Sequence, residues 1–253
     1  MMDKYEEEAF RELKKWQRQM MRSPSFMNNL TKKLQTKMNS FIPEKVHKAI
    51  TSAIKQMSRL VLFGAGYTTS KPREDGSLEL REAVIIEQIK FYKRTAAAEG
   101  GIIGAGGILL GLADFPLLLG IKIKLLFSIA ASYGFDVNDY RERVYILYIF
   151  QLAFSSQEMK KAVYLNMVNW KEQSKKLPDD IHQFDWRSFQ QEYRDYIDIA
   201  KMAQLVPVIG APVGIIVNYR LIKKLGITAM NAYRMRWNER QTGIEDEKKL
   251  LER

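Results

Sequence analysis

Apolar residues recur every three or four positions along most of the chain, which is the spacing of a helix with one buried face. No segment shows the strict alternation of apolar and polar residues that is typical of a half-buried β-strand. The helices expected from this spacing cover residues 4–21, 26–41, 46–61, 78–98, 116–133 and 141–154. The pattern predicts an all-α fold in a single multi-helix domain.

The best internal boundary is the stretch GAGYTTSKPREDG at residues 64–76, whose composition is typical of a turn-rich connector. We expect a basic amphipathic helical arm over residues 1–63, a helical core over 77–240 and a frayed tail over 241–253. The arm is strongly charged, because residues 11–59 contain twelve Lys or Arg against two Glu.

Two apolar segments rich in glycine and proline interrupt the core. In the first, at residues 99–120, glycines recur at positions i, i+4, i+7 and i+11, so on a helix they line one face that lets another backbone approach closely. Asp114 and Pro116 then suit the N-cap and the first turn of a following helix. The segment predicts a helical hairpin with its corner at these two residues. The glycines predicted to pack closely are Gly100, Gly104, Gly107 and Gly111.

The second segment, at residues 205–226, repeats the design. Its prolines bracket a turn, the second can open a helix, and Gly214 and Asn218 share one face of that helix. Asp114 and Asn218 are polar residues on otherwise apolar helices. They either contact each other or bond locally. The residues expected at this second corner and face are Pro207, Gly210, Pro212, Gly214 and Asn218.

Neither hairpin is a simple membrane span. In the first hairpin, the first arm has about 14 residues and is roughly 21 Å long, which is shorter than the hydrocarbon layer of about 30 Å. The second arm of the same hairpin contains Lys122 and Lys124. Burial in the protein core and a shallow membrane insertion with lysines reaching the headgroups both remain open.

The charge balance predicts an anionic partner. The formal net charge is +11, which fits either nucleic acid or anionic lipid headgroups. The aromatic residues of the arm lie on its apolar stripe rather than among its basic residues, so we expect an anionic membrane surface and no nucleic acid. The basic residues expected at that surface are Lys32, Lys33, Lys37, Lys122, Lys124, Arg220, Lys223 and Lys224.

The chain offers little recognisable catalytic chemistry. It has no cysteine and two histidines, of which His182 lies among acidic residues in a stretch that fits a solvated loop better than a metal site. The sequence GIIGAG at residues 101–106 lacks the lysine of a phosphate-binding loop. We therefore assign no catalytic, cofactor or metal residue. A soluble cytoplasmic hydrolase with an unrecognised site is the alternative function, and nucleic-acid binding is the third. The acidic first ten residues lack the apolar stretch of a secretory signal, which predicts a cytoplasmic protein.

Three motifs carry a family resemblance: ADFP at residues 113–116, PVIGAPVGIIVN at 207–218 and AMNAYRMRW at 229–237. In these motifs the chain resembles the EcsC family of bacterial proteins, over about residues 78–240. The family takes its name from a protein encoded beside the ATPase and membrane subunit of an ABC transporter in Gram-positive bacteria. The resemblance implies a membrane-associated accessory protein on the cytoplasmic face of the membrane, with the transporter ATPase or membrane subunit as partner. It implies no active site.

Overall fold

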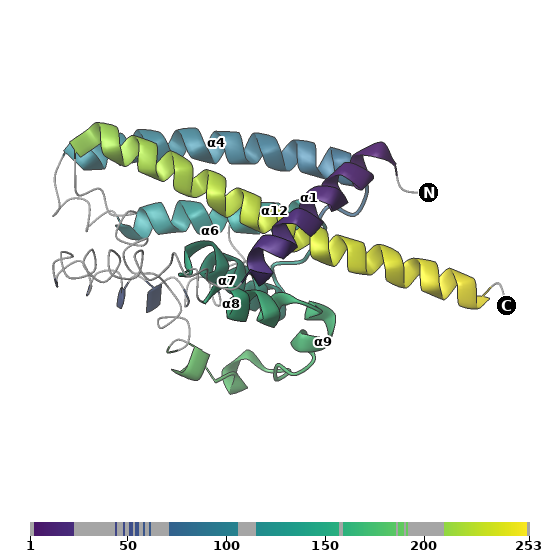
Figure 1. The fold of residues 1–253 in the computed structure, drawn as a ribbon. Coiled ribbons are helices and arrows are strands. Elements are labelled where there is room, and N and C mark those ends of the chain that lie inside the picture. The colour runs from purple at the N-terminus through teal and green to yellow at the C-terminus, as the bar shows by residue number, and fades with distance from the viewer. Residues whose placement is uncertain are drawn as a thin grey trace.

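The computed structural model describes residues 3–22, 71–105, 115–156, 159–185 and 210–251, with isolated positions over 44–61 and 187–191 (Figure 1). All regular elements in these residues are helical, which confirms the predicted all-α class. They are α1 (Lys4–Met21), α4 (Leu78–Ala105), α6 (Phe115–Ser132), α7 (Tyr140–Phe154), α8 (Lys160–Met167), α9 (Trp170–Ser174), the short 3-10 helix η2 (Ile181–Gln183) and α12 (Gly210–Leu251).

The central unit of the fold is an antiparallel pair formed by α4 and α12. In Figure 1, α4 runs along the top, and α12 starts beside it at the upper left and slopes down across the molecule. Glu82 meets Arg234 near one end of the pair, and Lys93 meets Tyr219 toward the other. Between them Gly226 allows a close approach, because a Cβ at this position would lie 2.6 Å from Cδ1 of Ile89. The glycine thus sets how closely the two helices pack.

The core lies beneath this pair. Helix α6 packs against both α4 and α12, and α7 packs against α12 and α8. Most residues of α7 are buried, as expected for a helix that is apolar on nearly all sides. Gly134 ends the α6 segment with a φ of +83°, and the amides of Gly134 and Phe135 bond back to the carbonyls of Ala131 and Ala130. This left-handed helix end favours glycine.

Helix α1 lies across the body and contacts α4, α8 and α12. Asp3 caps its first turn by accepting a hydrogen bond from the amide of Glu6. Leu13 and Trp16 are buried, and the Trp16 ring meets Tyr164 of α8 edge to face. The predicted helix over residues 4–21 is therefore confirmed, and it is packed directly on the core.

The first predicted hairpin has its two arms in place. Helix α4 continues through Gly100 and Gly104, α6 begins one residue before Pro116, and the two helices pack together. They run antiparallel, since Glu82 near the start of α4 bonds to Tyr133 just after α6. The remaining corner residues, Gly107, Gly111 and Asp114, lie outside the described residues, as do 26–41 and the connector from 64 to 70.

The second segment and the tail differ from expectation in one respect. Helix α12 begins at Gly210, so Pro212 lies in its first turn as predicted, and Pro207 lies outside the described residues. The same helix continues to Leu251, although the sequence predicts a frayed end from residue 241. In Figure 1 this last part of α12 extends past the other helices. Among the described residues, no helix is both long enough and apolar enough to cross a membrane.

Candidate functional site

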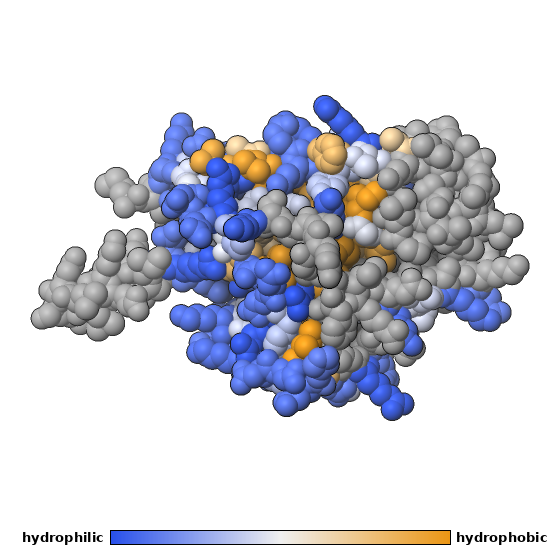
Figure 2. All heavy atoms as spheres, turned by 180° about the vertical axis from the view of Figure 1, so that it is seen from behind, coloured by the Kyte–Doolittle hydropathy of each residue, from blue (hydrophilic) through white to orange (hydrophobic). Residues whose placement is uncertain are grey.

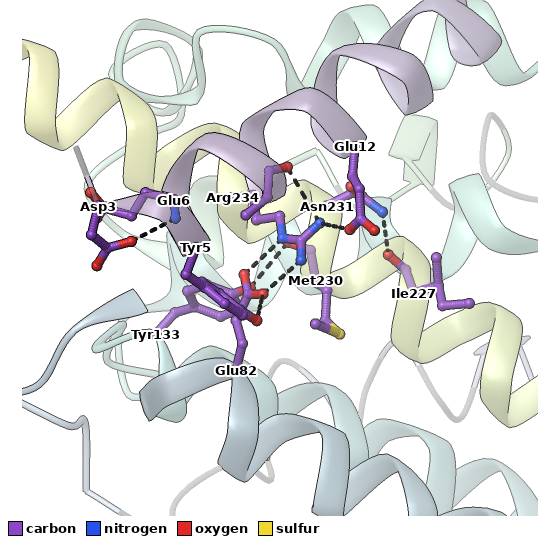
Figure 3. Close-up of polar contacts among 11 residues, drawn as sticks. Asp3, Tyr5, Glu6, Glu12, Glu82, Tyr133, Ile227, Met230, Asn231 and Arg234 are labelled. Carbon is purple, nitrogen blue, oxygen red and sulfur yellow. Dashed lines mark hydrogen bonds and ion pairs between the residues drawn. The ribbon is translucent and has the colours of Figure 1, made fainter. Parts of the chain in front are cut away.

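Glu82 and Arg234 form a buried ion pair where α1 crosses the α4–α12 pair (Figure 3). The guanidinium of Arg234 donates to both carboxylate oxygens of Glu82, at 2.7 and 2.6 Å. The hydroxyls of Tyr5 and Tyr133 donate to the same carboxylate, at 2.8 and 2.7 Å. Arg234 also donates to Glu12 of α1 at 2.8 Å. Every charge in this group therefore has a partner of opposite sign or a hydrogen bond.

The surroundings of this ion pair shift several pKa values in ways that stabilise the observed charges. Burial alone would lower the pKa of Arg234, but its hydrogen bonds and charge interaction with Glu82 outweigh that effect and raise it. Burial and the neighbouring Glu82 carboxylate raise the pKa of Tyr133 well above its ordinary value. The same two causes raise the pKa of Tyr5. The tyrosines therefore stay protonated as donors.

A second buried ion pair joins α7 to α12. Arg236 pairs with Glu142, and the hydroxyl of Tyr233 donates to Glu142 at 2.7 Å. The guanidinium of Arg236 lies 3.8 Å from the ring centroid of Phe135, and that of Arg240 lies at the same distance from this ring. Tyr233 and Arg236 belong to the AMNAYRMRW motif, so two residues of this family motif help to hold α12 on the core.

We call these two ion pairs and their tyrosines the charge layer: Glu82, Arg234, Tyr5, Tyr133, Glu142, Arg236 and Tyr233. The carboxylates of Glu82 and Glu142 are closed off from solvent, with residue exposures of 0% and 4%. Glu82 accepts four hydrogen bonds and Glu142 accepts two, which does not suit groups that must exchange protons with a substrate. In the described part of the chain, no three His, Cys, Asp or Glu side chains are grouped so that they could hold a metal ion. The charge layer is therefore a structural element.

The candidate functional site lies further along the same two helices, toward the ends where α4 finishes and α12 begins. Residues 86–98 and 216–227 contain six Lys or Arg and one acid, Glu87, which forms an ion pair with Lys90. We call the remaining cations and their apolar neighbours the basic face. It consists of Lys93, Arg94, Arg220, Lys223 and Lys224 with Phe91, Ile216 and Tyr219.

The apolar members of the basic face are unusually exposed for side chains of their size. Phe91 is 62% exposed, Ile216 51% and Tyr219 43%. In Figure 2, apolar side chains (orange) reach the surface between hydrophilic ones (blue) along the upper edge of the molecule, which α4 and α12 form in Figure 1. Apolar side chains among cations are typical of a surface that binds an anionic, partly apolar partner.

Lys93 and Tyr219 form the centre of the basic face by joining its two helices. The ammonium of Lys93 donates to the hydroxyl oxygen of Tyr219 at 3.1 Å and lies 4.4 Å from the ring centroid. The hydrogen bond from Lys93, its charge, and the charges of Lys223 and Arg94 lower the pKa of Tyr219. The phenol hydroxyl therefore lies in a local field of positive charge.

Several residues that the sequence singled out lie in or near this face. Arg220 and Lys223 are exposed and Lys224 is half-buried, all on α12, and Lys124 is exposed on α6. Gly100, Gly104, Gly210, Pro212 and Gly214 lie in helical turns of α4 and α12 near the ends of the pair. Lys32, Lys33 and Lys37 lie outside the described residues.

The expectation is wrong for Lys122, which is fully buried rather than at a membrane surface. Its ammonium donates to the side-chain oxygen of Asn218 at 3.3 Å. The physical reason is that α6 packs against both α4 and α12, so Lys122 points inward while Lys124, two positions on, reaches solvent. Asn218 is thus polar because it bonds to Lys122. The sequence leaves open whether Asn218 contacts Asp114 or bonds locally, and Asp114 lies outside the described residues.

The sequence reasoning missed the charge layer, although a signal was present. Glu82 lies on the same helical face as Leu78, Ile85 and Ile89, at spacings of four, three and seven, and all four are buried. A charged residue on an apolar stripe requires a buried partner, since an isolated buried charge is very costly. The partner itself could not be named, because Arg234 is 152 positions away.

Comparison with known proteins identifies the family of this chain. The profile of the EcsC protein family matches residues 7–237, nearly the whole chain, so the chain belongs to the EcsC protein family. It is 44% identical over 223 residues to Protein EcsC of Bacillus subtilis (strain 168), covering 87% of this chain and 91% of that protein.

A second relative in the same organism is more distant. The chain is 25% identical over 250 residues to the uncharacterized protein YdbA of Bacillus subtilis (strain 168), covering 90% of this chain and 91% of that protein. No solved structure matches the chain. The family match begins within α1 and ends at Trp237, so it includes the charge layer apart from Tyr5, and the whole basic face.

Proposed function

We propose that this protein is a peripheral membrane protein that binds the anionic cytoplasmic surface of a membrane and acts there as an accessory protein of an ABC-type transporter. The observation that supports membrane binding is the basic face, where exposed apolar side chains are surrounded by cations on two rigidly paired helices. The transporter partner is supported by the family resemblance.

The energetics fit reversible adhesion. Each Lys or Arg close to an anionic leaflet contributes about 1 kcal/mol. Five such residues on one face, together with partial insertion of Phe91 and Ile216, are sufficient for recruitment without a transmembrane segment. Because the attraction is electrostatic, we expect it to weaken as salt increases.

Flotation with liposomes tests membrane binding. We expect the protein to float with vesicles containing phosphatidylglycerol at low salt, and to stay at the bottom with pure phosphatidylcholine vesicles. High salt should release it. If the protein stays at the bottom with phosphatidylglycerol vesicles at low salt, the membrane proposal is wrong.

The transporter partner needs a separate experiment. Cross-linking in cells, followed by identification of the joined peptides, should link this protein to the ATPase or membrane subunit of an ABC transporter. Cross-links that reach only lipid or unrelated proteins would reject the partner while leaving membrane binding intact.

A further inference from the structure

Tyr219 and three neighbouring cations form a positive site that joins α4 and α12. Tyr219 comes from α12, and Lys93, which donates to its hydroxyl oxygen, comes from α4. Lys223 follows Tyr219 by one helical turn, and Arg94 follows Lys93 directly. The charged groups identified as acting on the Tyr219 hydroxyl are all cationic: Lys93, Lys223 and Arg94.

The hydrogen bond between Lys93 and Tyr219 also orients the site. Because the ammonium donates to the phenol oxygen, the phenol proton remains available to donate to another acceptor. Tyr219 is 43% exposed, so that acceptor can approach from solvent. An oxyanion is the acceptor that this arrangement favours, since a hydrogen bond to a charged group is about twice as strong as one between neutral groups.

The apolar neighbours indicate which oxyanion. Ile216 precedes Tyr219 by three positions on α12, and Phe91 precedes Arg94 by three positions on α4, so each lies beside a polar group of the site. A free anion in water would gain no favourable free energy from contact with these exposed apolar side chains. In a membrane, the phosphate of a phospholipid lies above its glycerol and ester groups and the acyl chains below them, so apolar side chains that reach past the phosphate gain burial.

We propose that Lys93, Arg94, Tyr219 and Lys223 form a binding site for the phosphate group of an anionic phospholipid in a membrane, with Phe91 and Ile216 entering the lipid beside it. This site rests on the proposed membrane function and makes it specific: the protein docks in one orientation instead of adhering through its total charge. A zwitterionic headgroup fits less well, because its own ammonium is repelled by the cations of the site.

The first test compares substitutions that change the same charge at different places. Lys93→Ala should lower the vesicle partition coefficient about fivefold or more, which is the effect of one basic residue held close to the lipid phosphate. Lys90→Ala removes the same charge three positions earlier, where Lys90 is paired with Glu87, and should change binding less than twofold. Equal losses for the two variants would overturn the site and leave general electrostatic adhesion.

A second pair of variants tests the hydroxyl without altering charge. Tyr219→Phe should lower the partition coefficient about threefold, which is the loss of about one hydrogen bond. Tyr92→Phe, on the half-buried tyrosine next to Lys93, should have no effect. Unchanged binding of Tyr219→Phe would show that the hydroxyl does not contact the lipid. Circular dichroism melting of each variant verifies that it is folded.

The orientation can be measured directly because the chain contains no cysteine. Ile216→Cys and Leu165→Cys each provide one labelling position for an environment-sensitive dye; Leu165 is exposed on α8, which packs on α7 and α1. With phosphatidylglycerol vesicles, the dye at 216 should shift to the blue and be quenched by chain-labelled lipid. The dye at 165 should do neither.

These experiments separate the two proposals. If the unmodified protein does not bind phosphatidylglycerol vesicles, both proposals fail. If it binds but the dye at 165 is quenched in place of the dye at 216, the phosphate site is wrong and the membrane function stands. Inorganic phosphate should not displace the vesicles at moderate concentrations; displacement would identify a free-anion site and overturn the lipid assignment.

Discussion

Arg234 and Lys93 lie on the same two-helix scaffold, yet their charges are used in opposite ways. Arg234 is buried in the charge layer, where carboxylates from α4 and α1 and two tyrosine hydroxyls surround the ion pair. Lys93 lies in the basic face, where it donates to Tyr219 beside Lys223 and Arg94, and where Phe91, Ile216 and Tyr219 are exposed.

The difference shows how one pair of helices can carry both stability and recognition. In the charge layer every charge is matched within the chain, so it fixes how α1, α4, α7 and α12 meet. In the basic face several cations from two helices lie close together, and an external anion would relieve the repulsion between them. We therefore expect substitutions in the charge layer to change stability, and substitutions in the basic face to change binding.

The largest effect should come from breaking the central ion pair. Arg234→Met leaves the Glu82 carboxylate buried without its cation and should lower the free energy of unfolding by about 3–5 kcal/mol. Arg220→Met on the basic face should change it by less than about 0.5 kcal/mol. Urea denaturation measures both. A loss below about 1 kcal/mol for Arg234→Met would contradict the structural role of the charge layer.

Alkaline pH should destabilise the protein through the buried tyrosines of the charge layer. The folded-state pKa of Tyr133 and of Tyr233 is raised by burial and by a neighbouring glutamate, so unfolding releases their protons once the pH exceeds the ordinary value near about 10. The unfolded state then binds fewer protons, and stability falls by up to about 1.4 kcal/mol per pH unit for each such group.

The phenol of the basic face should behave differently from those of the charge layer. Neighbouring cations lower the pKa of Tyr219, so it should ionise before the buried tyrosines in an ultraviolet absorbance titration. Tyr219→Phe should remove the earliest part of that titration, and Tyr133→Phe should leave it unchanged. An early phase that survives Tyr219→Phe would show that the field at the basic face is not as positive as the structure indicates.

Substitution of Gly226 tests how closely α4 and α12 pack in the middle of the pair. Gly226→Ala gains helix propensity of about 1 kcal/mol but forces a Cβ to within 2.6 Å of Ile89, which should cost about 1–3 kcal/mol. The net loss should be about 1 kcal/mol. Gly120→Ala on α6, where a Cβ meets nothing within 4 Å, should instead stabilise the protein by about 0.5–1 kcal/mol. Thermal unfolding distinguishes the two; equal gains would mean that α4 and α12 are not closely packed at Gly226.

The smallest effect is expected at the rim of the charge layer. Glu12 pairs with Arg234, but its side chain is 63% exposed, so water screens the pair. Glu12→Gln should lower the free energy of unfolding by at most about 1 kcal/mol, well below the loss for Arg234→Met. If the two losses are similar, Arg234 stabilises the fold mainly through Glu12 of α1 and not through Glu82 of α4.

The sequence predicted the helices well and the contacts between them poorly. The spacing of apolar residues located α1, α7 and both arms of the first hairpin, because an amphipathic helix is a local pattern. Arg220 and Lys223, which follow an apolar run directly, are exposed on α12, and their place at a membrane surface stays a prediction. The same reasoning failed for Lys122, because the burial of α6 depends on two helices that are distant in sequence.

The ion pairs of the charge layer could not be predicted from the sequence either, because their partners lie far apart along the chain. Glu142 lies near the start of the strongly apolar α7 and Arg236 lies in a basic stretch of α12, and nothing local to either residue identifies the other. Tyr219 was overlooked because an exposed tyrosine on α12 gains its role only from Lys93 on α4. The antiparallel register of the pair brings these residues together, and that register is a property of the fold.

The most direct test compares two variants that have the same net charge but lose their cations from different places. The variant Lys93→Glu, Arg94→Glu, Lys223→Glu and the control variant Lys171→Glu, Lys175→Glu, Lys176→Glu, on and after α9, both reverse three exposed or half-exposed cations. Each lowers the formal net charge from +11 to +5, since every reversal removes two charges. In liposome flotation, we predict that the first variant no longer floats with phosphatidylglycerol vesicles and that the second still does. Equal loss of flotation in both would contradict the basic face as the docking site.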